Sequence, residues 1–98
     1  MTPPDRHNTT TALPDYTPDG WDRLRAVADG VTMSFAEYQA TLAETVRRFE
    51  AEGMHIKLIA MDVADVDQMV EWCRREGYRL DPSGRAAFIG FKALWAAD

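Results

Sequence analysis

Four helix-start signals divide this chain of 98 residues and favour a mainly helical fold. Each signal is a Ser, Thr or Asp, whose side-chain oxygen accepts a hydrogen bond from the free N–H groups at the start of a helix. The four capping residues are Thr17, Ser34, Asp62 and Asp81. Pro18 and Pro82 follow two of them, and proline suits the first helical position because no N–H is needed there. Helices are therefore predicted to begin at these four places.

The second of these helices has the clearest apolar period. Ser34 and Glu37 form a capping box. Five apolar residues recur from there at steps of three and four, which places them on one helix face. These residues are Phe35, Tyr38, Leu42, Val46 and Phe49. Gly30, Gly53 and Gly77 stand where the first three helices are predicted to end, in the position that favours a left-handed backbone.

Residues 54–61 alternate between apolar and mixed side chains, which is the period of a half-buried strand. An isolated strand leaves its backbone hydrogen-bonding groups unpaired, so this strand needs a partner. Three partners remain open: the N-terminal residues, residues 78–80, or the same strand of a second copy. We therefore expect either a two-stranded sheet or a strand-paired homodimer.

The two ends of the chain are less regular than its middle. Residues 1–15 are polar, rich in threonine and interrupted by prolines, so we interpret them as a flexible arm, although residues 9–13 have some strand propensity. The tail over 82–96 is either a helix or, if residues 81–84 form a hairpin turn, a strand over 86–91. Its alanines favour the helix. Residues 16–98 are predicted to form one small domain.

These elements predict an α+β fold that is predominantly helical, with four helices and one strand. The composition, 46% hydrophobic and 28% charged, is typical of a globular domain. The formal net charge of −5 opposes non-specific attraction to nucleic acid and to anionic membranes. One cysteine and no apolar stretch long enough to span a bilayer lead us to expect a cytoplasmic protein without a membrane partner.

Several short motifs form a recognisable series along the chain. They are Tyr16-Thr17-Pro18 before a short helix, a helix over 34–49, a strand that leads into Asp62, then Trp72-Cys73-Arg74, and finally Arg85-Ala86-Ala87-Phe88 after Gly77 and Asp81. In this series the chain resembles a set of small, uncharacterised bacterial and prophage-type proteins. The resemblance implies an α+β arrangement with a C-terminal helix and an origin on a phage or another mobile element. It implies no activity.

We predict no catalytic residue, no metal ligand and no cofactor. A nucleophilic cysteine needs a lowered pKa and a base within reach, whereas Cys73 lies on an apolar helical stripe that favours burial. A dyad of Cys73 with His55 lacks a third group to orient it. Four acidic residues lie close together but lack the glycine-containing loop of a calcium site. These are Asp62, Asp65, Asp67 and Glu71.

Arginines and aromatic residues towards the tail are the predicted interaction residues. They are Trp72, Arg74, Arg75, Tyr78, Arg79 and Arg85. Tryptophan, tyrosine and arginine are the residue types that dominate binding hot spots. The same arginines, beside Tyr78 and Trp95, also offer a basic patch for nucleic acid, but neighbouring acidic residues and the net charge argue against it.

We therefore predict a non-enzymatic protein-interaction or regulatory module with an unknown protein partner. Self-association through the strand over 54–61 is part of this hypothesis. One alternative is a nucleic-acid-associated protein that uses Arg74, Arg75, Arg79 and Arg85. Another is a small enzyme or anion binder at Cys73 or at the turn from Asp81 to Arg85, where N–H groups at a helix start can hold an anion.

Overall fold

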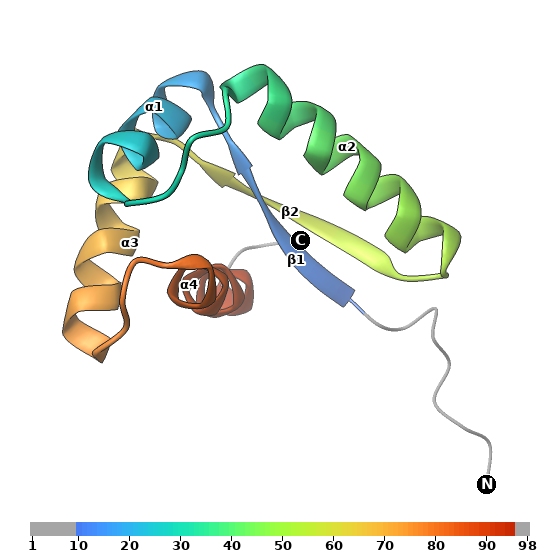
Figure 1. Ribbon diagram of the computed structural model, residues 1–98. Helices are drawn as coiled ribbons and strands as arrows, with labels where there is room; N and C mark the ends of the chain where they lie inside the picture. The colour runs from blue at the N-terminus through green and yellow to red at the C-terminus, as the bar shows by residue number, and fades with distance from the viewer. Residues whose placement is uncertain (1–9, 96–98) are drawn as a thin grey trace, which may run out of the picture.

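The computed structural model describes residues 10–95, which form four helices and a two-stranded parallel sheet (Figure 1). In chain order the elements are β1 (Thr10–Tyr16), α1 (Pro18–Val27), α2 (Phe35–Ala51), β2 (His55–Met61), α3 (Val63–Glu76) and α4 (Pro82–Trp95). The predicted fold class, α+β and predominantly helical, is confirmed. None of these helices is both long enough and apolar enough to cross a bilayer.

The partner of β2 is the N-terminal segment. Thr10 lies opposite His55 and Tyr16 lies opposite Met61, so β1 and β2 run parallel over their full lengths. Our interpretation of residues 10–15 as part of a flexible arm is therefore wrong. The unpaired backbone groups of β2 need a partner, and this need outweighs the polar composition of the segment. Residues 1–9 of the predicted arm lie outside the described residues.

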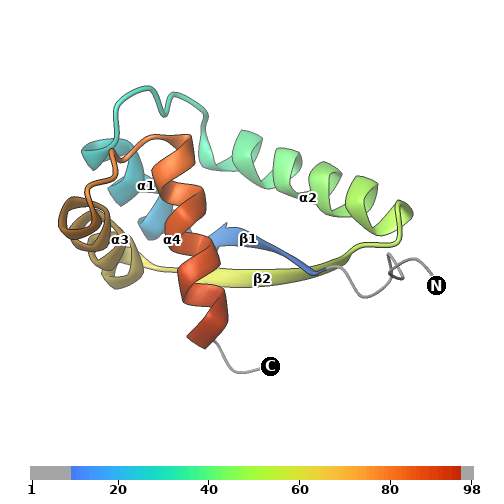
Figure 2. The same ribbon diagram turned by 90° about the horizontal axis from the view of Figure 1, so that it is seen from below.

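The sheet lies between two helices, with α2 above the strands and α4 below them in Figure 1. Seen from below, α4 crosses both strands (Figure 2). Because β1 and β2 are parallel, their carboxyl ends meet at one end of the sheet. There β1 leads into α1 and β2 leads into α3, and these two helices pack against each other.

All four predicted caps are present. The side chain of Thr17 accepts a hydrogen bond from the N–H of Gly20 at 3.0 Å, and that of Asp81 accepts one from the N–H of Gly84 at 2.8 Å. Ser34 and Asp62 each form a capping box with the residue three positions later. The cap at Asp81 begins α4, which confirms the helix in the tail and excludes the hairpin alternative.

The hydrophobic core lies at the carboxyl ends of the strands. Its buried residues are Tyr16, Trp21, Leu24, Ala28, Ile59, Met61, Val66, Met69, Cys73, Phe88 and Ile89. They come from both strands and from α1, α3 and α4. The 17-residue helix α2 has no buried residue, although Phe35 and Tyr38 near its start pack against the core. The core is therefore concentrated at one end of the sheet.

Candidate interaction site

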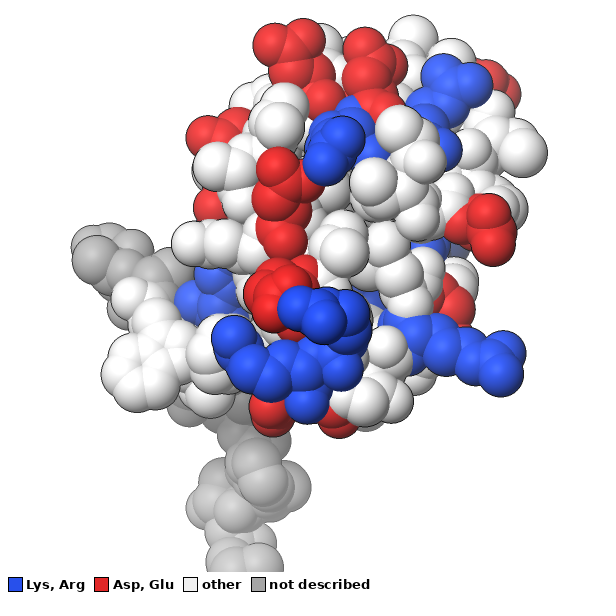
Figure 3. Space-filling model, turned by 90° about the vertical axis from the view of Figure 1, so that its left-hand side faces the viewer, with Lys and Arg blue, Asp and Glu red and all other residues white. Residues whose placement is uncertain are grey.

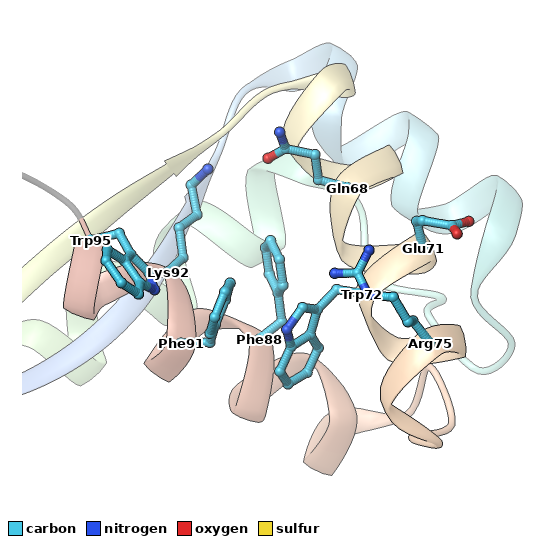
Figure 4. A pocket seen from close by; sticks show the side chains of 8 residues that line it. All are labelled: Gln68, Glu71, Trp72, Arg75, Phe88, Phe91, Lys92 and Trp95. Atoms are coloured by element: carbon cyan, nitrogen blue, oxygen red, sulfur yellow. The ribbon is translucent and has the colours of Figure 1, made fainter.

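A groove lies between α3 and α4 on the outer side of the molecule (Figure 4). Its volume is about 490 Å³, which falls in the range of ligand-binding pockets. Helix α3 contributes Gln68, Glu71, Trp72 and Arg75, and α4 contributes Phe88, Phe91, Lys92 and Trp95. On both helices the lining residues recur at steps of three and four, which places them on one face of each helix.

Stacked aromatic rings form one wall of this groove. The ring of Trp72 stacks on that of Tyr78 at a centroid distance of 5.3 Å and on that of Phe91 at the same distance. Trp95 continues the row with a centroid 6.4 Å from that of Phe91. The exposed fractions are 47% for Tyr78, 40% for Phe91 and 76% for Trp95. The row therefore presents large aromatic faces to solvent from a fixed arrangement.

The polar rim of the groove is mostly paired. The ammonium of Lys92 lies 2.7 Å from a carboxylate oxygen of Asp65. Burial raises the pKa of Asp65, but hydrogen bonds from Lys92 and Asp62 outweigh it, so the net shift of this pKa is downward. A hydrogen bond from Arg74 likewise lowers the pKa of Glu71. These pairs hold both carboxylates in the charged form.

Arg75 is the exception on this rim. Within residues 10–95 its guanidinium has no hydrogen bond and no ion pair with another side chain. It is exposed and lines the groove beside Trp72. A guanidinium presents a planar set of donors that matches a carboxylate. The groove therefore combines aromatic faces with one available cationic group.

The structure brings together only part of the predicted interaction set. Trp72 and Arg75 line the groove, and Tyr78 stacks on its wall. Arg74 instead pairs with Glu71, and the guanidinium of Arg85 donates to the carbonyl oxygen of Leu80 at 3.0 Å.

The predicted basic patch is therefore not continuous. Arg85 lines a separate hollow together with Pro14 and Tyr16, away from the α3–α4 groove. Arg79 is exposed but does not line the groove. On the face shown in Figure 3, basic side chains lie directly beside acidic ones. Such a mixed surface gives little attraction for a polyanion.

The sequence contained a signal for the α4 side of the groove. Phe88, Phe91 and Trp95 follow one another at steps of three and four, which is typical of one apolar helix face. In the structure Phe88 enters the core, whereas Phe91 and Trp95 remain exposed. The period identifies the face, but the crossing of α3 and α4 decides which part of it is covered.

The candidate catalytic residue is a core residue, as predicted. Cys73 is 2% exposed, and its thiol lies 3.6 Å from the carbonyl oxygen of Gly84. Burial and the nearby carboxylate of Asp81 raise the pKa of this thiol, which disfavours the nucleophilic thiolate. His55 begins β2, whereas α3 follows the other end of that strand, roughly 20 Å away. The two residues therefore form no dyad.

The acidic residues at the start of α3 are engaged in structural contacts. Asp62 and Asp65 cap the helix, and the carboxylate of Asp67 lies 2.8 Å from the guanidinium of Arg23. No group of three His, Cys, Asp or Glu side chains converges within residues 10–95. At the predicted anion site, the carboxylate of Asp81 already accepts the hydrogen bond of the Gly84 N–H. This carboxylate would also repel an anion.

The α3–α4 groove is thus the candidate site favoured by the chemistry of its lining residues. It offers aromatic surface and a guanidinium, which suit binding rather than bond cleavage. Comparisons with protein-family models, with curated proteins and with solved structures found no match to this chain.

Proposed function

We propose that this protein is a non-enzymatic protein-interaction module that binds a segment of a partner protein in the α3–α4 groove. The observation that carries the proposal is the row of ring contacts from Tyr78 through the half-buried Trp72 to Phe91 and Trp95, in which Tyr78, Phe91 and Trp95 are exposed. Burying a large apolar side chain stabilises a complex by roughly 1.5–3 kcal/mol. A partner that covers this row therefore gains affinity from a small contact area.

The stacked arrangement supports binding in a second way. Trp72 is held between Tyr78 and Phe91, so its ring has little conformational freedom left to lose when a partner binds. Exposed tryptophan and tyrosine side chains in a concave site are typical of binding hot spots. Preorganisation of this kind reduces the entropic cost of association.

The charges on the rim favour a particular partner chemistry. Glu71 and Lys92 are already paired, whereas the guanidinium of Arg75 makes no hydrogen bond and no ion pair within residues 10–95 and acts on Glu71 only through its charge. We therefore propose that the bound segment carries large apolar side chains and a carboxylate that reaches Arg75. Cys73, the single cysteine, is a buried free thiol, in keeping with our proposal that the protein acts in the reducing cytoplasm.

Selection from a library of random peptides displayed on phage tests this proposal. We expect enrichment of peptides that combine aromatic or long aliphatic residues with Asp or Glu. Synthetic versions of these peptides should quench the fluorescence of Trp72 and Trp95 with micromolar dissociation constants. The Trp95→Ala variant should bind them about tenfold more weakly, which is a loss of about 1.4 kcal/mol.

The neighbouring residue supplies the matched control. Leu94 is 81% exposed on the same helix but does not line the groove. Leu94→Ala should therefore change peptide affinity by less than about twofold, because its side chain makes no contact in the groove. The proposal is overturned if no peptide is enriched above the bare support, or if the two variants bind the selected peptides equally well.

A further inference from the structure

The two edges of the β1–β2 sheet are protected very differently. With two strands, the sheet has one free edge along β1 and one along β2. Free edges present unpaired N–H and C=O groups that can pair with another strand, and proteins usually block them. A difference between the two edges therefore indicates which one is available for pairing.

The edge of β1 is blocked at its carboxyl end. The hydroxyl of Tyr38, from α2, donates to the carbonyl oxygen of Pro14 and accepts a hydrogen bond from the N–H of Tyr16 at 3.2 Å. Pro14 itself has no N–H to offer, and proline within a sheet is typical of an edge position. A further strand cannot pair along this part of β1.

Among the described residues, no side chain bonds to the outer backbone groups of β2, and β2 contains no proline. The N–H of Thr17, which continues β1, donates to the carbonyl oxygen of Met61 at 3.0 Å. In a parallel pair, the backbone N–H and C=O groups of every second residue point towards the neighbouring strand. The bond to Met61 shows that the groups of residues 55, 57, 59 and 61 point towards β1. The backbone groups of Ile56, Leu58 and Ala60 therefore point outward, where no described strand pairs with them.

The side chains along this outer edge do not discourage pairing either. The residues whose backbone groups point outward, Ile56, Leu58 and Ala60, include no proline and no charge. The lysine of this strand, Lys57, reaches back to α4, where its ammonium lies 3.4 Å from the carbonyl oxygen of Ala93. Leu58 is 47% exposed at the middle of the strand. Within residues 10–95 this edge thus has both unpaired backbone groups and an exposed apolar side chain.

We propose that the outer edge of β2 pairs antiparallel with β2 of a second copy of this chain. Leu58 is the central residue of the seven in β2, so a two-fold axis there places Leu58 of one copy opposite Leu58 of the other. Ile56 then lies opposite Ala60, a large residue against a small one. In this register all three residues donate and accept hydrogen bonds across the axis. The result is a continuous four-stranded sheet.

The surroundings of the edge fit the same arrangement. The C-terminal end of α4 extends beyond β2 in Figure 2, and it leaves Leu94 81% exposed. A neighbouring strand at this edge would lie against that end of α4. On the other face, Leu42 and Val46 of α2 line a shallow hollow with Leu58 that a second copy of α2 would help to cover.

The self-complementary register favours a second copy over a strand of another protein. An unrelated strand would satisfy the backbone groups but would have no reason to centre on Leu58. The dimer does not use the wall of the α3–α4 groove, so it would carry two such grooves. Failure of the dimer would leave the peptide-binding proposal intact, and failure of peptide binding would leave the dimer intact.

Sedimentation velocity over a range of protein concentrations tests the proposal. We expect a particle of twice the chain mass of 11.1 kDa at high concentration. Leu58→Lys should raise the dissociation constant of the dimer at least tenfold, because two lysines would face each other across the axis. Val27→Lys makes the same charge change at a residue that is 37% exposed on α1, and it should leave the dimer unchanged.

Cysteine cross-linking tests the register independently of stability. In the proposed pairing, Cα atoms of opposed residues lie about 5.5 Å apart, which a disulfide can span. Leu58→Cys should therefore form a cross-linked dimer on oxidation. Ala60→Cys should not, because the two copies of residue 60 would lie roughly 14 Å apart along the strands. A monomer at all concentrations, or equal cross-linking of both variants, would overturn the proposal.

Discussion

At the carboxyl ends of β1 and β2, side chains from α1, α3 and α4 close over the sheet, and Met61, Val66 and Met69 have no exposed surface. At the amino ends, the sheet is flanked by α2, a longer helix with no buried residue. Both regions use amphipathic elements with clear helix caps. They differ in how completely the apolar side chains are removed from water.

The difference separates the stabilising part of the molecule from its binding surfaces. Near its start α2 is held by Tyr38, whose ring stacks on Trp21 at a centroid distance of 4.4 Å. Helix α4 spans both regions, because Phe88 and Ile89 are buried near its start whereas Leu94 and Trp95 are exposed at its end. Exposed apolar surface can be kept at one end because the other end supplies the core.

The largest expected effect compares the same substitution in the two regions. Leu24 in α1 is 1% exposed, whereas Leu42 in α2 is only half-buried. Leu24→Ala should lower the free energy of unfolding by about 3 kcal/mol, because it leaves a cavity in a packed core. Leu42→Ala should lower it by less than about 1 kcal/mol, because its site is partly open to water.

Urea denaturation followed by far-ultraviolet circular dichroism measures both values. The slope of the free energy against urea should stay the same in both variants if each still unfolds in one step. A loss of similar size in the two variants would show that α2 is packed as tightly as α1, and the contrast between the two regions would be broken.

A second comparison uses two glycines of α4. A methyl group at Gly84 would meet the carbonyl oxygen of Arg79 at 1.9 Å, whereas one at Gly90 would meet nothing within 4 Å. Gly84→Ala should destabilise the protein by about 2 kcal/mol through overpacking. Gly90→Ala should stabilise it by about 1 kcal/mol, because alanine is the better helix former. Thermal unfolding of both variants at equal concentration measures these effects, and opposite signs are the expected result.

These two glycines also show what the sequence could and could not predict. Helix starts such as Ser34 and Asp62 were predictable because a cap depends on residues within one turn. The weakening effect of glycine in α4 was equally predictable. The close approach that requires glycine at position 84 was not, because it depends on how the chain from Gly77 to Asp81 folds back onto α4.

Strand pairing and the groove depend on long-range contacts in the same way. The period of 54–61 showed that β2 needs a partner, but the partner lies more than forty residues earlier in the chain. The aromatic residues of α4 recur at a spacing typical of an apolar face, yet only the packing against α3 decides that Phe91 stays exposed. Arg85 was grouped with other arginines by sequence proximity, whereas its position in the first turn of α4 directs it to Leu80.

The smallest expected effect concerns the contact that joins the two regions. Tyr38→Phe removes the hydroxyl that bonds to Pro14 and Tyr16 but keeps the ring that stacks on Trp21. It should lower the free energy of unfolding by about 1 kcal/mol, because two backbone groups lose a partner. Tyr78→Phe is the matched control, since no other residue in 10–95 bonds to the Tyr78 hydroxyl.

The pH dependence of that loss identifies the hydroxyl as its cause. Burial raises the pKa of Tyr38 from 10.0 to about 12, so the folded state favours the neutral phenol more strongly than the unfolded chain does. The resulting stabilisation is complete below pH 10 and is lost as the pH rises towards 12. Tyr38→Phe has no ionisable group at this position, so the advantage of about 1 kcal/mol that wild type has in unfolding free energy should shrink above pH 10 and reverse in sign as the pH approaches 12. Tyr16, whose pKa burial also raises to about 12, remains in both proteins, so its contribution largely cancels in the difference. A difference that stays constant over this range would mean that the hydroxyl is not shielded from water, and that Tyr38 does not fasten α2 to the edge of β1.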